Sequence, residues 1–401
     1  MSSQGVTGVG EGSAGLGWRR GWRRGWRRGW RRGWRRGWRR GWILSPGHDL
    51  VWFLLLPIAA VLVAMGCHHW LPYVALASVN LWVTIPHHCS TWVRTYGLAE
   101  DWQRWRSRLL LGPVLIGGVA ILGHRWAPTT LLLLVTMWDH QHSIMQQHGF
   151  ARIYDFKAGT GTPRTGRFDL ALNWVLYANM FLTAPLFVQY WVRELFTWRV
   201  PIGVESVQAI QGVSWSVTAV VLAAYAVHLA GCLRRGAGVN AVKLLVLLVS
   251  YGLWYGTAWH TDSILVFGIA HRLMHGLQYM VIVRIYLARK ARDRGESGGG
   301  LGLSLSGRGG LWRFVVISLL YALVFQLVVG QPQPLETFGF GVWEFNSVYE
   351  AIPELGVGRL GERQMYELFA MAMVDAVAMV HYYFDSFIWK VSDRTVQEGL
   401  R

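Results

Sequence analysis

Charged residues are scarce in this chain, and so are cysteines. Only 15% of its 401 residues are charged, against about 25% in an ordinary soluble domain. Hydrophobic residues make up 53%, and 24 residues are tryptophan. This composition is typical of a protein whose solvent is a lipid bilayer, and it excludes an ordinary soluble domain.

Several chemical signatures are also missing. Cys67, Cys89 and Cys232 form neither a CxxC pair nor a disulfide framework. The chain has no GxSxG, Walker, dinucleotide-binding or CxxCH motif. We therefore expect neither serine hydrolysis nor nucleotide binding. Residues 1–16 are polar and no apolar stretch follows them, so no cleavable signal peptide is predicted.

Much of the positive charge lies in one repeat. The unit GWRR is copied six times from Gly17 to Arg40, and without its arginines the formal net charge falls from +17 to +5. Such a segment could bind a membrane surface or nucleic acid, or it could be a low-complexity expansion or an upstream stretch translated from a mis-set start. Glycine at every fourth position opposes a helix. We predict a disordered Arg/Trp-rich segment over residues 1–41 that lies against anionic lipid, with no nucleic acid partner.

Long apolar runs predict an all-α, polytopic membrane helix bundle of about ten transmembrane helices. A helix needs about 20 apolar residues to cross the hydrocarbon core, and the first and third runs are short enough that one of them could be re-entrant. The expected spans are residues 51–66, 71–88, 109–123, 129–147, 170–190, 213–231, 242–260, 262–286, 311–329 and 364–389.

Basic residues crowd into alternate loops, which predicts the topology. By the positive-inside rule both termini lie in the cytoplasm, as in a multi-pass protein of the bacterial inner membrane. We expect an eight-helix membrane bundle over residues 42–291 and a flexible cytoplasmic linker over residues 292–310. Residues 311–401 then hold the final two transmembrane helices, with an external cap at residues 330–363.

Histidines gather toward the predicted inner ends of the even-numbered helices. Ionisable side chains at membrane depth are rare and face a partner or a cavity. A single one is more often a structural residue than a ligand, but eight at one depth favour a metal site. The candidate metal ligands are His87, His88, His140, His142, His148, His271, His275, His381 and Asp385.

Helical spacing ranks these candidates. His271 and His275 are four residues apart, so they share a helix face and could share one metal or bridge two. Asp385 follows His381 at the same spacing, where it could ligate the metal or hold the imidazole. His140 and His142 lie about 200° apart on a regular helix, and both face inward only if the helix breaks. His140 therefore ranks lower.

The donor set limits the metal. Imidazoles with one carboxylate suit iron, copper or zinc, whereas magnesium and calcium prefer oxygen ligands. The residues alone leave iron, copper, zinc and haem open.

The clusters PHH, HSIMQQHGF, HRLMH and HYYFD resemble the histidine boxes of integral-membrane non-haem iron proteins. That class includes the fatty-acid desaturase and hydroxylase superfamily and the Brp/Blh carotene dioxygenases. HRLMH fits HxxxH, but neither HxxHH nor QxxHH occurs. QQHGFARIYD and HYYFDSFIWK also resemble segments of uncharacterised bacterial membrane proteins. The resemblance implies non-haem iron, mononuclear or dinuclear, in an O₂-dependent oxygenase, hydroxylase or desaturase. The substrate would be apolar and lipid-like, and electrons would come from a separate donor.

Other classes stay open at this point. A haem or haem–copper protein also uses intramembrane histidines, and a transporter or channel could carry structural ones. A zinc-dependent lipid hydrolase is a further alternative. Arg94, Tyr96, Arg152 and Tyr154 could bind a headgroup or relay protons, or they could anchor the protein at the interface.

Overall fold

The computed structural model describes residues 41–293, 309–329 and 362–390, together with residues 393, 396, 397 and 399. Every regular element in this part of the chain is a helix, which confirms the all-α class. The described residues form eleven helices when the continuous stretch of α2, η1 and α3 is counted as one. The GWRR repeat, most of the predicted linker and most of the predicted cap lie outside the described residues. The division into domains therefore stays a prediction.

The first helical stretch consists of α2 (Pro46–Asp49), the π-helix η1 (Leu50–Leu55) and α3 (Leu56–Trp70). Ser45 caps it, and Pro46 occupies the first turn, where a missing N–H costs nothing. The carboxylate of Asp49 accepts the backbone N–H groups of Ile43 and Leu44 at 2.7 and 2.9 Å and the Tyr154 hydroxyl at 2.9 Å. Asp49 thereby fastens the start of the described chain to α6.

Three long helices follow with at most two residues between them: α4 (Tyr73–Gly97), α5 (Ala99–Trp126) and α6 (Pro128–Ala158). Each extends beyond the apolar run that predicted it. An apolar run stops at the first polar cluster, whereas backbone hydrogen bonding continues through it when neighbouring helices bury the polar side chains. α6 ends at Gly159, whose φ of 61° is left-handed and suits a residue without a Cβ.

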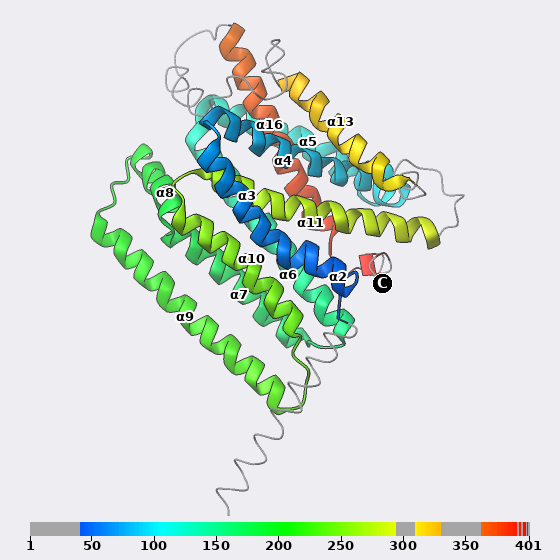
Figure 1. Cartoon of the computed structure of the whole chain (residues 1–401). Coiled ribbons are helices and arrows are strands. Elements are labelled where there is room, and N and C mark those ends of the chain that lie inside the picture. Colours follow the sequence, from blue (N-terminus) through cyan, green and yellow to red (C-terminus); the bar gives the residue numbers. More distant parts are fainter. Residues whose placement is uncertain are drawn as a thin grey trace, which may run out of the picture.

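The single helix expected over residues 170–190 is wrong. The chain instead forms α7 (Pro163–Thr183) and α8 (Pro185–Thr197), which are bent by 70°. Pro185 has no N–H and disfavours a helical conformation in the residue before it. Ala184 accordingly adopts an extended ψ of 132°. α8 runs as a short separate helix at one end of the bundle (Figure 1).

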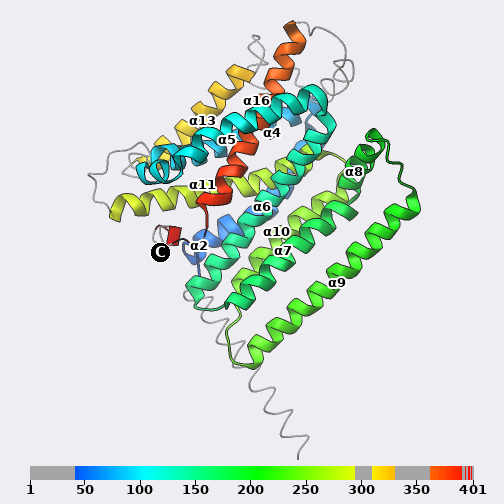
Figure 2. The same cartoon turned by 180° about the vertical axis from the view of Figure 1, so that it is seen from behind.

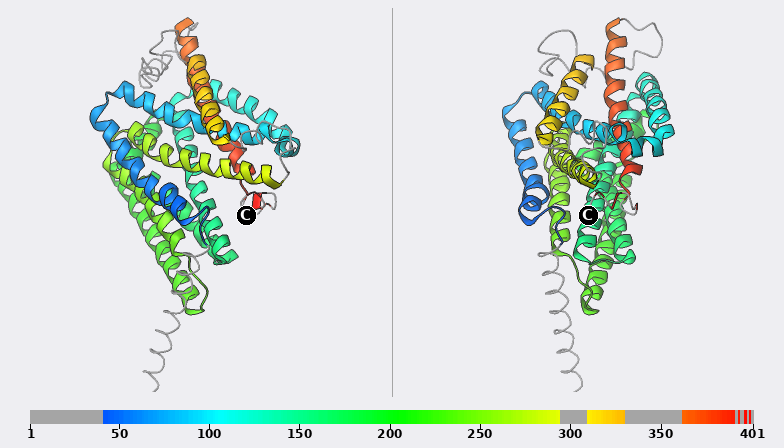
Figure 3. Two further views of the ribbon diagram at one scale, coloured as in Figure 1. Left: turned by 45° about the vertical axis from the view of Figure 1, so that its right-hand side comes forward. Right: turned by 90° about the vertical axis from the view of Figure 1, so that its right-hand side faces the viewer.

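The remaining helices are α9 (Val204–Arg234), α10 (Ala241–His260), α11 (Ile264–Asp293), α13 (Gly310–Val329) and α16 (Glu362–Ile388). α9 lies at the outside of the molecule against α7 (Figures 1 and 2). α11 packs along α4 and α3, and α16 packs along α5. Figure 3 shows α4, α5 and α11 crossing the direction of α7, α9 and α10. The crossing brings α4, α6, α11 and α16 together in the interior.

Six of the described helical segments are long and apolar enough to cross a membrane, or seven if the bent pair α7–α8 is one span. The protein is therefore a multi-pass integral membrane protein. The prediction of about ten transmembrane helices is therefore wrong. α4, α6 and α11 fall short because they carry histidines and other polar residues that neighbouring helices bury. The orientation of the termini stays a prediction. The six segments are Pro46–Trp70, Ala99–Trp126, Val204–Arg234, Ala241–His260, Gly310–Val329 and Leu368–Ile388.

Candidate metal centre

Five buried imidazoles from four helices meet in the interior. α4 contributes two of them, His87 and His88, whose ring centroids are 4.5 Å apart. Both rings contact His381 of α16, at 4.9 and 4.8 Å. Adjacent residues project about 100° apart around a helix, and here both directions point toward α16. Histidines of α4 and α16, which lie far apart in the sequence, therefore meet in the folded protein.

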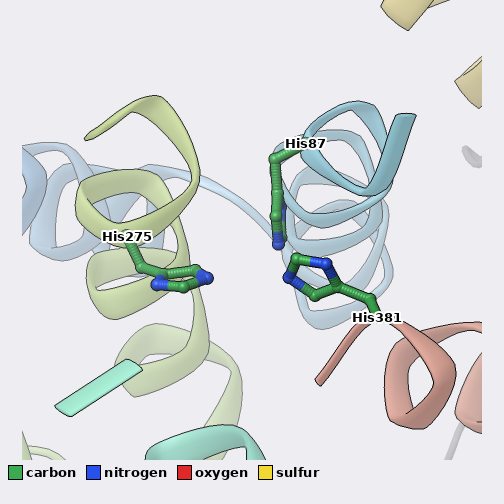
Figure 4. Close-up of side chains that lie close together, drawn as sticks. All are labelled: His87, His275 and His381. Carbon is green, nitrogen blue, oxygen red and sulfur yellow. The ribbon is translucent and has the colours of Figure 1, made fainter. Parts of the chain in front are cut away.

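His275 of α11 and His142 of α6 complete the group. The His275 ring lies 5.2 Å from that of His87, and the His142 ring lies 4.8 Å from those of His275 and His381. Figure 4 shows His87, His275 and His381 pointing toward one another from three helices. We call His87, His88, His142, His275 and His381 the histidine centre.

Two sets of three ligands in this region have a spacing suited to a metal ion. They are His87, His275 and His381, and His142, His381 and Asp385. Within each set one ligand atom of each residue lies within 4.8 Å of the others, and all the residues are buried. His142 Nε2 and Asp385 Oδ2 are 3.7 Å apart. His381 belongs to both sets, so the two describe one region rather than two distant sites.

The ring nitrogens of the centre have few partners. Among the described residues none forms a hydrogen bond with either nitrogen of His88 or His275, or with Nε2 of His87, His142 and His381. Leaving a buried polar atom unpaired costs about 1–3 kcal/mol. Five converging imidazoles with open lone pairs are the donor set that iron, copper or zinc binds. The residues present therefore fit a metal ion.

A hydrogen-bonded network orients His381. The Tyr279 hydroxyl donates to Asp385 Oδ1 at 2.8 Å, and Thr91 Oγ1 lies 2.7 Å from both the Tyr279 oxygen and His381 Nδ1. Because the Tyr279 hydroxyl donates to Asp385, the Thr91 hydroxyl donates either to Tyr279 or, at 3.3 Å, to Asp385 Oδ1. In the tautomer that carries its proton on Nδ1, His381 donates to Thr91 Oγ1. This arrangement leaves the Nε2 lone pair of His381 directed into the centre.

Sequence reasoning missed Thr91 and Tyr279. Helical spacing carried the signal, since Thr91 follows His87 by four residues and Tyr279 follows His275 by four. A hydroxyl one turn after a candidate ligand shares its face and can hold a neighbouring imidazole.

A second pair of imidazoles lies beside the centre. His140 and His271 have ring centroids 4.9 Å apart, and His271 Nε2 is 3.3 Å from Asp139 Oδ2. Asp139 also accepts two hydrogen bonds from Arg272, at 3.1 and 2.9 Å. No described residue forms a hydrogen bond with Nε2 of His140. Asp139 and Arg272 were not predicted, although each directly adjoins a predicted histidine.

The expectation that His140 and His142 need a broken helix is wrong. α6 is continuous and both residues are buried. Each faces a different group, His142 the histidine centre and His140 the pair with His271. The HxxxH motif divides in the same way, because His275 joins the centre and His271 joins His140. The two faces of α6 thus serve two adjacent polar groups.

His148 lies apart from the centre, half-buried on α6, within electrostatic reach of Asp169, Arg152 and Lys243. The prediction that histidines lie at helix ends also fails for α4 and α6. His87 and His88 sit within α4, which continues to Gly97, and His142 lies within α6, which continues to Ala158. Only the apolar runs ended near these residues.

The four interfacial candidates have partners inside the protein. Arg94 stacks on Trp389 at 3.6 Å and donates to the Ile388 carbonyl at 2.5 Å, and Tyr96 donates to the Leu109 carbonyl at 2.8 Å. Arg152 pairs with Asp155 and Asp169 at 2.9 and 3.1 Å. Tyr154 donates to Asp49. These contacts hold helices together.

Comparison of the chain with protein-family models, curated proteins and solved structures finds no match. The family resemblance suggested by the histidine clusters thus stays a prediction.

Proposed function

We propose that the protein is a membrane-embedded, metal-dependent oxidoreductase that acts on an apolar, lipid-like substrate. The observation that carries the proposal is the convergence of five buried imidazoles with unpaired nitrogens. A fold does not retain so many unpaired polar groups for stability, since each opposes folding. Metal coordination satisfies them.

We propose non-haem iron as the metal. The ligands are His87, His275 and His381, with His142 and Asp385 on the adjoining side and His88 beside them. His381 offers one lone pair when its Nδ1 donates to Thr91, so the two sets form one coordination site. A second ion would take His140, His271 and Asp139.

Seven pairs among the five rings are in contact, with centroids 4.5 to 6.2 Å apart. This close packing favours a bare ion over a haem macrocycle. Metal analysis, together with the absorption spectrum, separates these two readings.

The residues around the centre would support oxidation chemistry. Bound iron supplies O₂ activation, which side chains alone lack. Thr91 and Tyr279 fix the imidazole of His381 and the carboxylate of Asp385. The membrane helices around the centre keep bulk water away from the reaction. We propose an oxygenase, hydroxylase or desaturase that receives electrons from a separate donor.

Metal analysis of the detergent-purified protein tests the proposal. We expect one to two iron atoms per chain, and loss of most of that iron in His275→Ala and His381→Ala. His228→Ala is the matched control, because His228 is buried but bonds Thr165 at 3.1 Å. Iron retained in both centre variants, or haem absorbance in the wild type, would contradict the proposal. Zinc in place of iron would contradict the oxidoreductase proposal, because zinc has no redox chemistry. Copper in place of iron would contradict the assignment of non-haem iron.

A further inference from the structure

A cavity of about 480 Å³ leads into the histidine centre from one end of the bundle. Its walls come from α4, α6, α7, α8, α11 and α16. On α11 the lining runs from Ile264 to Arg272, and eight residues of helix span about 12 Å. This volume is within the range of about 300–1,000 Å³ typical of small-molecule sites.

His88 is the member of the histidine centre that lines this cavity. It is fully buried within the protein, belongs to neither three-ligand set, and lies 4.8 Å from the His381 ring. No described residue forms a hydrogen bond with its ring nitrogens. His88 therefore stands between the cavity and the proposed ligands, at the point where a substrate would meet the centre.

The other charged groups at this deep end are already paired. Arg272 donates to Asp139 and to Asn80, and Asp375 lies 2.8 Å from His124 Nε2. A charged substrate group placed here would have to displace these partners. The deep end therefore suits an uncharged, apolar part of a substrate.

Apolar side chains line much of the cavity wall, among them Leu133, Phe187 and Leu265, and a cation lies at its outer end. At the outer end, Arg193 of α8 is exposed and forms no ion pair with any described residue. The neighbouring Glu194 is buried and accepts a hydrogen bond from Thr130.

Exposed aromatic residues mark this end as a membrane interface. Phe196 and Trp198 follow Arg193 on the same short segment, and they are 56% and 57% exposed. Tryptophan is enriched at headgroup depth, where its ring is part apolar and part polar. The Trp198 Nε1–H donates to Thr130 at 3.2 Å, which ties α8 to the first turn of α6.

We infer that this cavity binds a single-chain amphiphile with an anionic head. Arg193 binds the head at the interface, and the apolar chain extends inward to His88. The inference deepens the proposed function, since it names the substrate class and the route to the same centre. The anionic group could be the carboxylate of a fatty acid or the phosphate of a lysophospholipid, and a guanidinium binds either.

Photo-cross-linking in phosphatidylcholine nanodiscs tests this inference. The probe is an 18-carbon fatty acid with a diazirine near its methyl end, alongside the matching alcohol. We expect labelling of α4 residues 80–85 or α16 residues 374–378, mapped by mass spectrometry. Excess oleate or lysophosphatidate should suppress it, and the stronger competitor identifies the head.

Arg193→Gln should reduce labelling by the acid about tenfold at low probe concentration, the effect of losing one charge-assisted hydrogen bond. Labelling by the alcohol should not change. Arg199→Gln is the matched control, because Arg199 lies just beyond α8 and does not line the cavity. Leu133→Trp fills the cavity and should block both probes.

Labelling confined to a lipid-facing helix such as α9 would overturn the inference, as would equal labelling of Arg193→Gln and Arg199→Gln by the acid. Cross-linking needs no metal, so this test fails independently of the metal analysis. Labelling of the cavity in a protein without iron would support the cavity assignment and contradict the oxidoreductase proposal. Iron in the protein without labelling of the cavity would contradict the cavity assignment and support the oxidoreductase proposal.

Discussion

α6 contributes to two buried polar regions that differ in one respect. Near its end, Arg152 and Asp155 join Asp169 of α7 and Lys243 of α10 in a charged network. All four carboxylate oxygens of the two aspartates accept hydrogen bonds from described residues. In the histidine centre, nearer the middle of α6, most ring nitrogens lack such partners.

The difference separates a structural role from a ligand-binding role. Two cations and two anions in mutual contact satisfy one another, and the network joins α6, α7 and α10 without any further component. The histidine centre consists of imidazoles alone and has no set of opposite charges that satisfy one another. The lone pairs of its ring nitrogens gain a partner when a metal cation binds. We therefore infer that the charged network stabilises the packing of the helices and that the histidine centre is a binding site.

Removing one charge from the network should give the largest loss of stability. Lys243→Ala leaves two buried carboxylates against one arginine, since Lys243 Nζ lies 2.9 Å from Asp155 and 3.1 Å from Asp169. Breaking a buried ion pair costs about 3–5 kcal/mol. Thermal unfolding in detergent should show a much lower midpoint. Lys390→Ala, an exposed lysine, is the control, and equal midpoints for the two variants would remove the structural role of the network.

A change at the edge of the histidine centre should act on metal binding instead. Thr91→Val removes the hydroxyl that holds His381 Nδ1. Loss of such a supporting hydrogen bond weakens metal affinity about 10- to 100-fold. A competition titration with a chelator measures it, and Thr91→Ser should restore most of the affinity. An unchanged affinity in the valine variant would show that the hydrogen bond does not set the imidazole orientation.

Removing one peripheral hydrogen bond of the charged network should give the smallest loss of stability. Tyr225→Phe removes a hydroxyl that donates to Asp169 Oδ1 at 2.8 Å but leaves both cations in place. A loss of about 1.5–3 kcal/mol is expected for a hydrogen bond to a charged group. The unfolding midpoint should fall between those of the wild type and Lys243→Ala. A loss as large as that of the lysine variant would mean that the hydroxyl, rather than the charge balance, holds the network.

The sequence predicted the helices better than it predicted the membrane crossings. Apolar runs located a helix at each expected position, because lipid-facing surface leaves a long hydrophobic signal. They overstated the number of spans, because the polar residues that α4, α6 and α11 carry beside their apolar runs make each whole helix less apolar than the six segments suited to crossing a membrane. The break at Ala184 was readable from Pro185, but the apolar residues on both sides of it suggested one continuous span.

The residue types predicted a histidine-rich site, but they did not predict which histidines lie together. Four residues separate His271 from His275, yet only His275 enters the histidine centre. That division depends on how α11 lies against α6 and α4, which local spacing does not determine. Asp139 and Arg272 were invisible for the same reason, because their pairing joins two helices far apart in sequence.

X-ray absorption at the iron edge of the metal-loaded protein tests directly whether the histidine centre holds the metal. We expect nitrogen and oxygen neighbours at about 2 Å, with the outer-shell scattering of several imidazoles, and loss of that scattering in His381→Ala. A spectrum dominated by oxygen ligands without imidazole, or one unchanged in His381→Ala, would contradict it.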